Sequence, residues 1–269
     1  MSDQIIGLHE WFETPPGQYL LDWERSRFDE AVADIFGYHS LQLGLPVLDV
    51  LQANRMPHRW LALDQVGEGL QPPQPPHPAA ALFTDFAALP FPAASLDLVA
   101  LPHTLELSPD PHTTLREVER VLVPEGRVVL SCLNPASLWG LAQKRARIYQ
   151  RVGLGASYLP EAGEFLGYWR LRDWLRLLGF EVETVHFGCY RPAVRSQQWL
   201  ERHAWMDRVG PRWWSILGAA YFIVAVKRVH GMRLMSPSWK PVRARVSAPV
   251  SIANSAGAAG AKAQYDVKN

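Results

Sequence analysis

The feature that most constrains the fold is a strand–helix–strand pattern between residues 95 and 133. The apolar runs at 95–103 and 127–133 are nearly continuous, which is typical of strands covered on both faces of a parallel sheet. Between them the motif SPDP at 108–111 ends the first strand and supplies an aspartate N-cap with a proline at the first helical position. The segment therefore predicts one βαβ unit with a right-handed crossover.

The same alternation continues along the chain and predicts a doubly wound sheet with helices on both faces. We expect further strands at 39–43, 59–64, 80–85, 181–187 and within 217–227. We expect helices at 46–54, 111 to about 122, 137–150, 170–178 and 195–208. The stretch 65–79 contains five prolines and is expected to be a surface loop.

Composition divides the chain into three parts. Residues 1–35 are expected to form an N-terminal helical lid or cap, residues 36–230 the main domain, and residues 231–269 a disordered tail rich in small residues. The longest apolar stretch, residues 213–226, is 14 residues long and is expected to be a buried strand, because a membrane span needs about 20. The beginning of the chain lacks the pattern of a secretory signal.

Charge and cysteine content exclude several classes of protein. Lys and Arg total 27 against 26 Asp and Glu, so nothing indicates a nucleic-acid partner. Two cysteines, Cys132 and Cys189, form no CxxC pair, which favours a reducing, cytoplasmic location. Nine histidines show no metal-ligand spacing, and we expect no metal.

Six of the eleven tryptophans lie between residues 169 and 214. We favour packing in the core as their role over an aromatic wall that binds a ligand.

Four short motifs occur in order between residues 85 and 126: D-x-x-x-LPF, S-x-D-x-V, H-x-LE and L-x-PEG. Together they resemble the second half of a class I S-adenosylmethionine-dependent methyltransferase domain of type 11. The resemblance covers roughly residues 36–227. It implies a Rossmann-like sheet, mostly parallel with an antiparallel last strand, and methyl transfer from S-adenosylmethionine to an acceptor, most simply a small molecule.

In open α/β sheets the ligand lies beyond the carboxyl ends of the strands. The resemblance therefore assigns cofactor binding to residues that follow strands: Gly44, Asp64, Asp85, Phe86, Leu101 and Pro102. Asp64 would accept from the ribose hydroxyls, Asp85 would meet the adenine amino group, and Phe86 would cover the ring. Asp85 could instead shape its own turn by accepting a backbone hydrogen bond.

Two further side chains are candidates for contact with the methyl acceptor. His103 is the candidate base, since histidine can accept a proton at neutral pH; a hydrogen-bonded structural histidine is the alternative. Glu106 is expected to be a local structural acceptor. Asn134 could contact the substrate or form a turn before Pro135.

Two aromatic residues of the lid segment, Trp11 and Tyr19, are candidates for cofactor binding. Their rings could stack on adenine or attract the sulfonium. Ordinary packing is the alternative.

The chain departs from the family where the first strand should lead into a G-x-G-x-G turn. Here Gly44 stands alone, Leu45 adds bulk, and Pro46 has no amide hydrogen to donate. This departure keeps open an alternative function, a catalytically inactive binding or scaffold protein. A nicotinamide-dependent oxidoreductase is a third interpretation, which the same missing turn disfavours.

Overall fold

The computed structural model describes residues 11–64, 82–151, 165–194 and 196–229, with the backbone alone for 147–151. The chain divides into two units between His230 and Gly231. The predicted tail, the proline-rich stretch 65–79 and the first ten residues lie outside the described residues. In the described ranges no helix is both long and apolar enough to cross a membrane.

The domain is built on a seven-stranded sheet with the strand order β3-β2-β1-β4-β5-β7-β6. The strands are β1 (His39–Leu43), β2 (His58–Leu63), β3 (Leu82–Phe83), β4 (Leu96–Pro102), β5 (Leu122–Leu133), β6 (Phe180–Gly188) and β7 (Ala220–Lys227). β1 to β5 pair in parallel, and β7 runs antiparallel to both β5 and β6. The predicted doubly wound sheet with an antiparallel last strand is confirmed.

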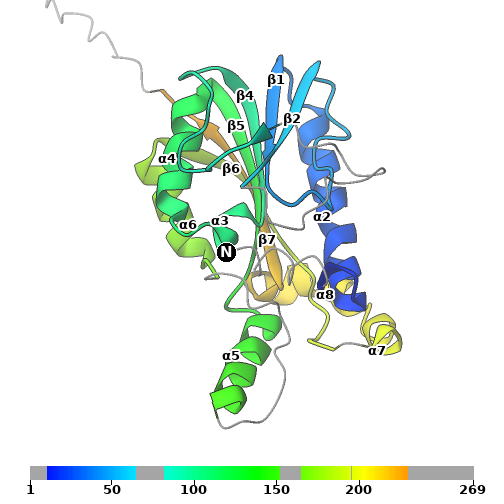
Figure 1. Cartoon of the computed structure of the whole chain (residues 1–269). Helices are drawn as coiled ribbons and strands as arrows, with labels where there is room; N and C mark the ends of the chain where they lie inside the picture. The colour runs from blue at the N-terminus through cyan, green and yellow to red at the C-terminus, as the bar shows by residue number, and fades with distance from the viewer. Residues whose placement is uncertain (1–10, 65–81, 152–164, 195, 230–269) are drawn as a thin grey trace, which may run out of the picture. The chain divides into compact units, whose positions relative to one another are not determined.

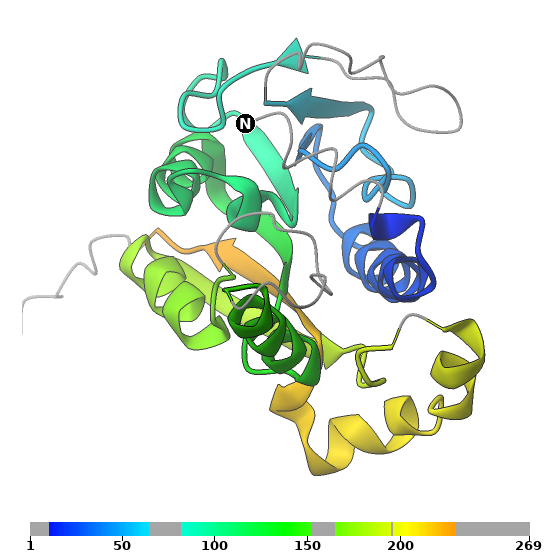
Figure 2. The ribbon, with the colours of Figure 1, turned by 60° about the horizontal axis from the view of Figure 1, so that its bottom comes forward.

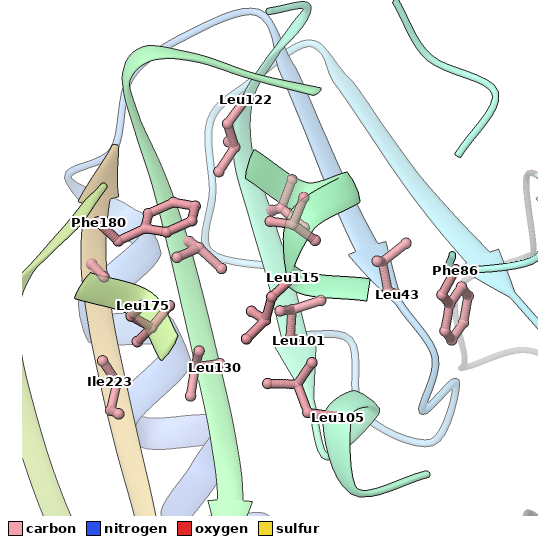
Figure 3. Packing of buried hydrophobic residues seen from close by; sticks show 14 of the residues in the cluster. Leu43, Phe86, Leu101, Leu105, Leu115, Leu122, Leu130, Leu175, Phe180 and Ile223 are labelled. Carbon is pink, nitrogen blue, oxygen red and sulfur yellow. The ribbon is translucent and has the colours of Figure 1, made fainter. Parts of the chain in front are cut away.

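Helices lie on both faces of the sheet (Figures 1 and 2), and each face has its own hydrophobic core. The helix α2 (Pro15–Ala33) covers one face, where the Phe28 ring meets the Phe222 ring edge-on at 4.9 Å. The helices α4 (Pro111–Val121) and α6 (Tyr168–Leu177) cover the other face, together with the short helix α3 (Thr104–Leu107). Figure 3 shows this second core, in which Leu115 and Leu175 lie against the strands.

The βαβ unit forms as its sequence predicts. Asp110 caps α4 by accepting a hydrogen bond from the Thr113 amide at 3.1 Å, and Pro111 takes the first helical position. The apolar stripe of α4, from Leu115 to Val121, is buried. β5 begins earlier than the predicted residue 127, because Leu122 already pairs with Leu96 before the chain bulges outward.

The predicted helix at 46–54 is absent, and residues 46–53 form consecutive turns. The buried side chain of Gln42 explains the difference, because its amide nitrogen donates to the carbonyls of Gly44, Leu45 and Leu48 at 2.8–3.1 Å. Its amide oxygen accepts from the Val50 amide at 3.1 Å. One side chain thus supplies the hydrogen bonds that would otherwise come from a helix. On this face α2 therefore takes the place that a crossover helix would fill.

The C-terminal half also differs from the expectation in two places. The predicted helix at 195–208 is two helices, α7 (Gln197–Arg202) and α8 (Met206–Trp213), and a 3₁₀ turn, η1 (Ser215–Leu217), follows them. The predicted buried strand in 213–226 is confirmed only from Ala220 onward. Four of the six clustered tryptophans are exposed, so packing was the wrong interpretation for them: Trp169, Trp199, Trp205 and Trp213. The helix α5 (Leu138–Arg151) matches its prediction.

Candidate functional site

The carboxyl ends of four parallel strands come together at one edge of the sheet. The Gly44 amide, just after β1, donates to the Ala62 carbonyl of β2 at 2.8 Å. The Thr84 amide, just after β3, donates to the Leu63 carbonyl at 2.9 Å. A Cβ placed on Gly44 would lie 3.7 Å from the Phe86 ring and 3.7 Å from Oγ1 of Thr104, which follows β4. The ends of these four strands therefore lie next to one another.

The space between β1 and β4 is the point at which the sheet changes direction of winding. The last registered pair between these strands is Gln42 with Ala100, just before both strands end. Thr104 closes this gap, because its buried hydroxyl donates to the Leu43 carbonyl. Sequence reasoning missed Thr104; its place directly after a strand end was the available signal. Figure 3 shows the Phe86 ring beside Leu43 at the end of β1.

The first turn adopts an unusual backbone that partly replaces the missing glycines. Gly44 has φ +74° and Leu45 has φ +45°, so both residues lie in the left-handed region. The Leu45 side chain is buried in the core under α2 and does not fill the space beside Phe86. Its amide N–H has no acceptor among the described residues. The turn thus contains one backbone donor at the end of β1 that is unpaired within the described part of the chain.

The two predicted acids lie at neighbouring strand ends. Asp64 is half-buried, and partial burial together with the charge of Asp85 raises its pKa. Asp85 is exposed and accepts a hydrogen bond from the Ala87 amide at 2.8 Å, which is the turn-shaping role foreseen as its alternative. One carboxylate oxygen of Asp85 thus serves the turn, and Asp64 remains the better placed of the two for a ligand's hydroxyls.

His103 lies in a buried cluster with two carboxylates. Its Nδ1 is 2.7 Å from Oε2 of Glu106. Its Nε2 is 2.8 Å from Oε1 of Glu24 on α2, an ion pair by distance in which the ring N–H is not well aimed at the oxygen. Burial alone would lower the pKa of His103, but the charges of Glu24 and Glu106 outweigh it and raise the pKa to about 10. Glu106 also accepts from the Leu133 amide, and burial raises its pKa.

This cluster corrects the expectation that His103 is a general base. A ring that is already protonated at neutral pH, with both nitrogens beside carboxylates, has no lone pair for a substrate proton. The structural alternative describes His103 better, since it joins α2 to the end of β4. Glu106 is the structural acceptor that the sequence predicts.

The buried side-chain amide of Asn134 makes three hydrogen bonds within the domain. Its Nδ2 donates to the carbonyls of Ile216 at 2.6 Å and Gly218 at 2.9 Å, and its Oδ1 accepts from the Ala136 amide at 3.0 Å. The predicted substrate contact is therefore replaced by the alternative role, a turn that also anchors η1.

Leu101 and Pro102 are buried at the end of β4, where they pair with Leu130 and Ser131 of β5. The Pro102 carbonyl accepts weakly from the Thr104 hydroxyl at 3.4 Å. Leu101 and Pro102 are thus the last two residues of β4 and do not follow it, and their contact with a cofactor stays a prediction.

Trp11 and Tyr19 lie in a second aromatic group and not beside Gly44. Trp11 is buried, with its ring 5.9 Å from that of Trp139. The Tyr19 hydroxyl donates to Asp207, and the Arg191 guanidinium lies 4.2 Å from the centre of its ring. The ordinary packing foreseen as the alternative describes both residues, and the cation over Tyr19 occupies the ring face that would meet adenine.

A groove of about 620 Å³ lies away from the strand ends, between α6 and β6, with Arg172, Arg176 and Arg228 among its lining residues. In the part of the chain that the structure describes, no group of three or more His, Cys, Asp or Glu side chains is arranged to hold a metal ion.

Comparison with solved structures defines the class of protein. A possible histamine N-methyltransferase from Thermotoga maritima matches with a TM-score of 0.51, at 14% identity, over 76% of this chain and 89% of its own. A methyltransferase from Archaeoglobus fulgidus matches with a TM-score of 0.51, at 18% identity, over 77% and 94%. A chain from the complex between the Haloferax volcanii Trm112 methyltransferase activator and a putative methyltransferase matches with a TM-score of 0.53, at 16% identity. This match covers 83% of this chain and 97% of that chain. The described residues have the fold of class I S-adenosylmethionine-dependent methyltransferases.

Comparison with sequences agrees with this class of protein. Residues 51–130 match the family model described as "Methyltransferase domain", and the resemblance predicted from the motifs is confirmed. The match begins after the end of β1, so the unusual turn at 44–46 lies outside it. A relative from Escherichia coli K12, "Uncharacterized protein YafS", is 39% identical over 94 residues, 35% of this chain. The chain spans 36% of that relative's length. These findings support S-adenosylmethionine as the cofactor.

Proposed function

We propose that this chain transfers a methyl group from S-adenosylmethionine to a small-molecule acceptor. The observation that carries the proposal is the contact among the ends of β1, β2, β3 and β4, which brings Gly44, Asp64, Asp85 and Phe86 to one place. In this fold a ligand lies beyond those ends, at the point where the winding reverses.

The groups present at the strand ends fit most parts of the cofactor. The Leu45 amide, which has no acceptor among the described residues, suits the methionine carboxylate, and Asp64 suits the ribose hydroxyls. Phe86 offers an apolar ring for the adenine. The Phe86 ring and the Thr104 hydroxyl border the space beside Gly44, where an added Cβ would meet both at an ordinary contact distance of 3.7 Å. A larger group of the cofactor at this position would require the Phe86 ring to turn aside.

When bound, S-adenosylmethionine supplies a methyl group on a positively charged sulfur. The residues of this chain would hold and orient it: Asp64 through the ribose, and the Leu45 amide through the carboxylate. The rate of an in-line displacement depends mainly on such alignment. Since His103 is already protonated, an acceptor that attacks without losing a proton to this histidine suits the site best.

Calorimetry with S-adenosylhomocysteine tests the cofactor part of this proposal. We expect Asp64→Asn to weaken binding by roughly 10- to 100-fold, because it removes a charged hydrogen-bond acceptor. The matched control is Asp173→Asn, at an exposed aspartate of α6, with unchanged binding. Absence of heat with the unaltered chain at high ligand concentration would argue against the proposal.

The second candidate function, an inactive binding or scaffold protein, is favoured by the missing glycines after Gly44 and by Pro46, which has no amide donor. Transfer of a labelled methyl group from S-adenosylmethionine into a cell extract separates the two. Labelling by the unaltered chain and not by Asp64→Asn supports the enzyme. Ligand binding without any labelling supports the second candidate.

A further inference from the structure

The helices α5, α7 and α8 and the turn η1 lie at the edge of the sheet where the parallel strands end (Figure 1). β5 leads directly into α5, and Leu133 at its end pairs with Ala220, which follows η1. The Trp139 indole of α5 donates to the Arg191 carbonyl at 2.8 Å, and Asn134 donates to the Ile216 carbonyl. These contacts fix α5 and η1 to the same end of the domain.

We use the name Trp–Arg surface for the exposed Trp and Arg side chains of α7, of α8 and of the residues between them: Trp199, Arg202, Trp205, Arg208, Arg212 and Trp213. The inner face of α8 is held firmly. Asp207 accepts from Arg191 Nε at 2.8 Å, and a Cβ on Gly210 would come within 2.4 Å of the Tyr190 ring. Because α8 is bound through these two residues, the opposite stripe of Trp205, Arg208 and Arg212 faces solvent.

Large apolar side chains are unusually exposed on this surface. The exposed fractions are 51% for Trp199, 53% for Trp205 and 75% for Trp213. Ile216 and Leu217 of η1 add 47% and 44%. Exposed apolar groups that gather in one region mark sites of interaction. Tryptophan in particular suits a boundary, because its ring is apolar and its N–H remains able to reach water.

The charge of this region differs from that of the whole chain, where basic and acidic residues nearly balance. Residues 197–217 hold three arginines against Glu201 and Asp207, and Asp207 is turned inward to Arg191. The sequence of α5 contains four Lys or Arg residues and no acid, and Lys144 and Arg145 are exposed. Aromatic side chains therefore alternate with a local excess of positive charge.

We propose that the Trp–Arg surface binds the headgroup region of membranes that contain anionic lipids. Tryptophans next to arginines, on helices that lie along a surface, match the interface between headgroups and acyl chains. The arginines would pair with lipid phosphates, and the indoles would enter the boundary beneath them. This inference does not depend on the proposed methyl transfer, so vesicle binding can fail or succeed independently of cofactor binding.

Flotation of the full chain with lipid vesicles, without cofactor, tests the inference. We expect co-flotation with vesicles that contain phosphatidylglycerol, weaker binding to phosphatidylcholine alone, and a further loss at high salt, which screens the charge. Arg208→Gln with Arg212→Gln should weaken binding to the anionic vesicles by roughly 30-fold, from about 1 kcal/mol for each arginine. Trp205→Ser with Trp213→Ser should abolish binding to both vesicle types.

The matched control combines Phe36→Ser with Arg116→Gln, an exposed aromatic residue and an exposed arginine outside this surface, and should float like the unaltered chain. Circular dichroism and thermal unfolding establish that every variant is folded. No flotation with anionic vesicles, or equal flotation of the folded variants and the unaltered chain, would overturn the inference. The inference would also be overturned if the chain bound no vesicles and formed a dimer in ultracentrifugation, and if the double variant Trp205→Ser with Trp213→Ser abolished that dimer. The surface would then bind a second copy of the chain.

Discussion

His103 and Thr104 occupy the end of β4, and both hold neighbouring elements together. The Thr104 hydroxyl joins β4 to the Leu43 carbonyl, and His103 joins it to Glu24 of α2. A buried hydrogen bond or ion pair stabilises the fold only when both partners are present. Removing one partner leaves the other buried and unpaired, which costs free energy. At the scale of single residues, the strand ends that converge on the candidate site are therefore fixed by buried polar contacts.

The buried ion pairs of His103 make stability depend on pH. The folded chain keeps its proton up to a pKa of about 10, whereas the unfolded chain loses it near pH 6.5. The contribution of the His103 ion pairs to the free energy of unfolding is therefore complete below pH 6.5 and declines as the pH rises toward 10. Between pH 6.5 and 8.5, urea unfolding should show the free energy of unfolding falling by up to about 1.4 kcal/mol per pH unit.

Glu24→Gln should flatten this pH dependence, because it removes one of the charges that raise the pKa of His103. The control is Glu30→Gln on the same helix, at an exposed ion pair with Arg27, and should keep the slope. A free energy of unfolding that is constant or rises over this range in the unaltered chain would contradict the assignment of a protonated His103.

Asn134 offers a second test at the residue scale. Replacing it by Ala removes three hydrogen bonds within a buried turn and leaves two carbonyls unpaired. We expect a loss of about 2–3 kcal/mol in the free energy of unfolding, measured by urea denaturation. If stability is unchanged while the KM of a methyl acceptor rises, Asn134 is instead the substrate contact first considered.

At the scale of elements, the first crossover is the part of the fold that departs most from expectation. Residues 46–53 make turns organised by Gln42, so α2 is the helix that covers this half of the sheet. Its residue Phe28 is fully buried against Phe222. This arrangement makes α2 a component of the core, whereas a lid would be separable from it.

Phe28→Ala should therefore lower the free energy of unfolding by about 3–5 kcal/mol, because it leaves a cavity between α2 and the sheet. Phe36→Ala, at an exposed position shortly before β1, is the matched control and should change stability little. Chemical denaturation followed by circular dichroism measures both. A small loss in Phe28→Ala would indicate that α2 is a separable cap.

Elements with a strong local signal could be predicted from the sequence, and those set by distant contacts could not. β4, α4 and β5 have apolar runs and an N-cap that are visible within a few residues. The apolar spacing of 46–54 is compatible with a helix, and only the tertiary position of Gln42 decides against it. In the same way His103 looks like a base until α2 brings Glu24 beside it.

At the scale of the whole molecule, a cofactor at the proposed site would connect strand ends that are distant in sequence. Hydrogen–deuterium exchange with S-adenosylhomocysteine should therefore show added protection in several separate peptides: residues 43–45, 84–87 and 102–106. Binding stabilises the folded chain by an amount that grows with ligand concentration, about 2.7 kcal/mol at 100 times Kd. Peptides from β6 serve as the internal control.

Protection confined to the groove between α6 and β6 would place the ligand elsewhere and contradict the proposed site. The charge of the whole chain could not have indicated the Trp–Arg surface either, because the balance of acids and bases hides a local excess that appears only when α5 and α8 lie at one end.

The Phe86 ring, which borders the space beside Gly44, has a thermodynamic consequence for a ligand that extends into the position of the ring. Such a molecule binds only the fraction of chains in which the ring has rotated away, and its apparent affinity falls in proportion to that fraction. Each 1 kcal/mol by which the closed rotamer is preferred weakens the observed affinity roughly fivefold. The free-energy preference for the closed rotamer of Phe86 thus sets the ligand concentration at which the site fills, together with the contacts that the ligand makes.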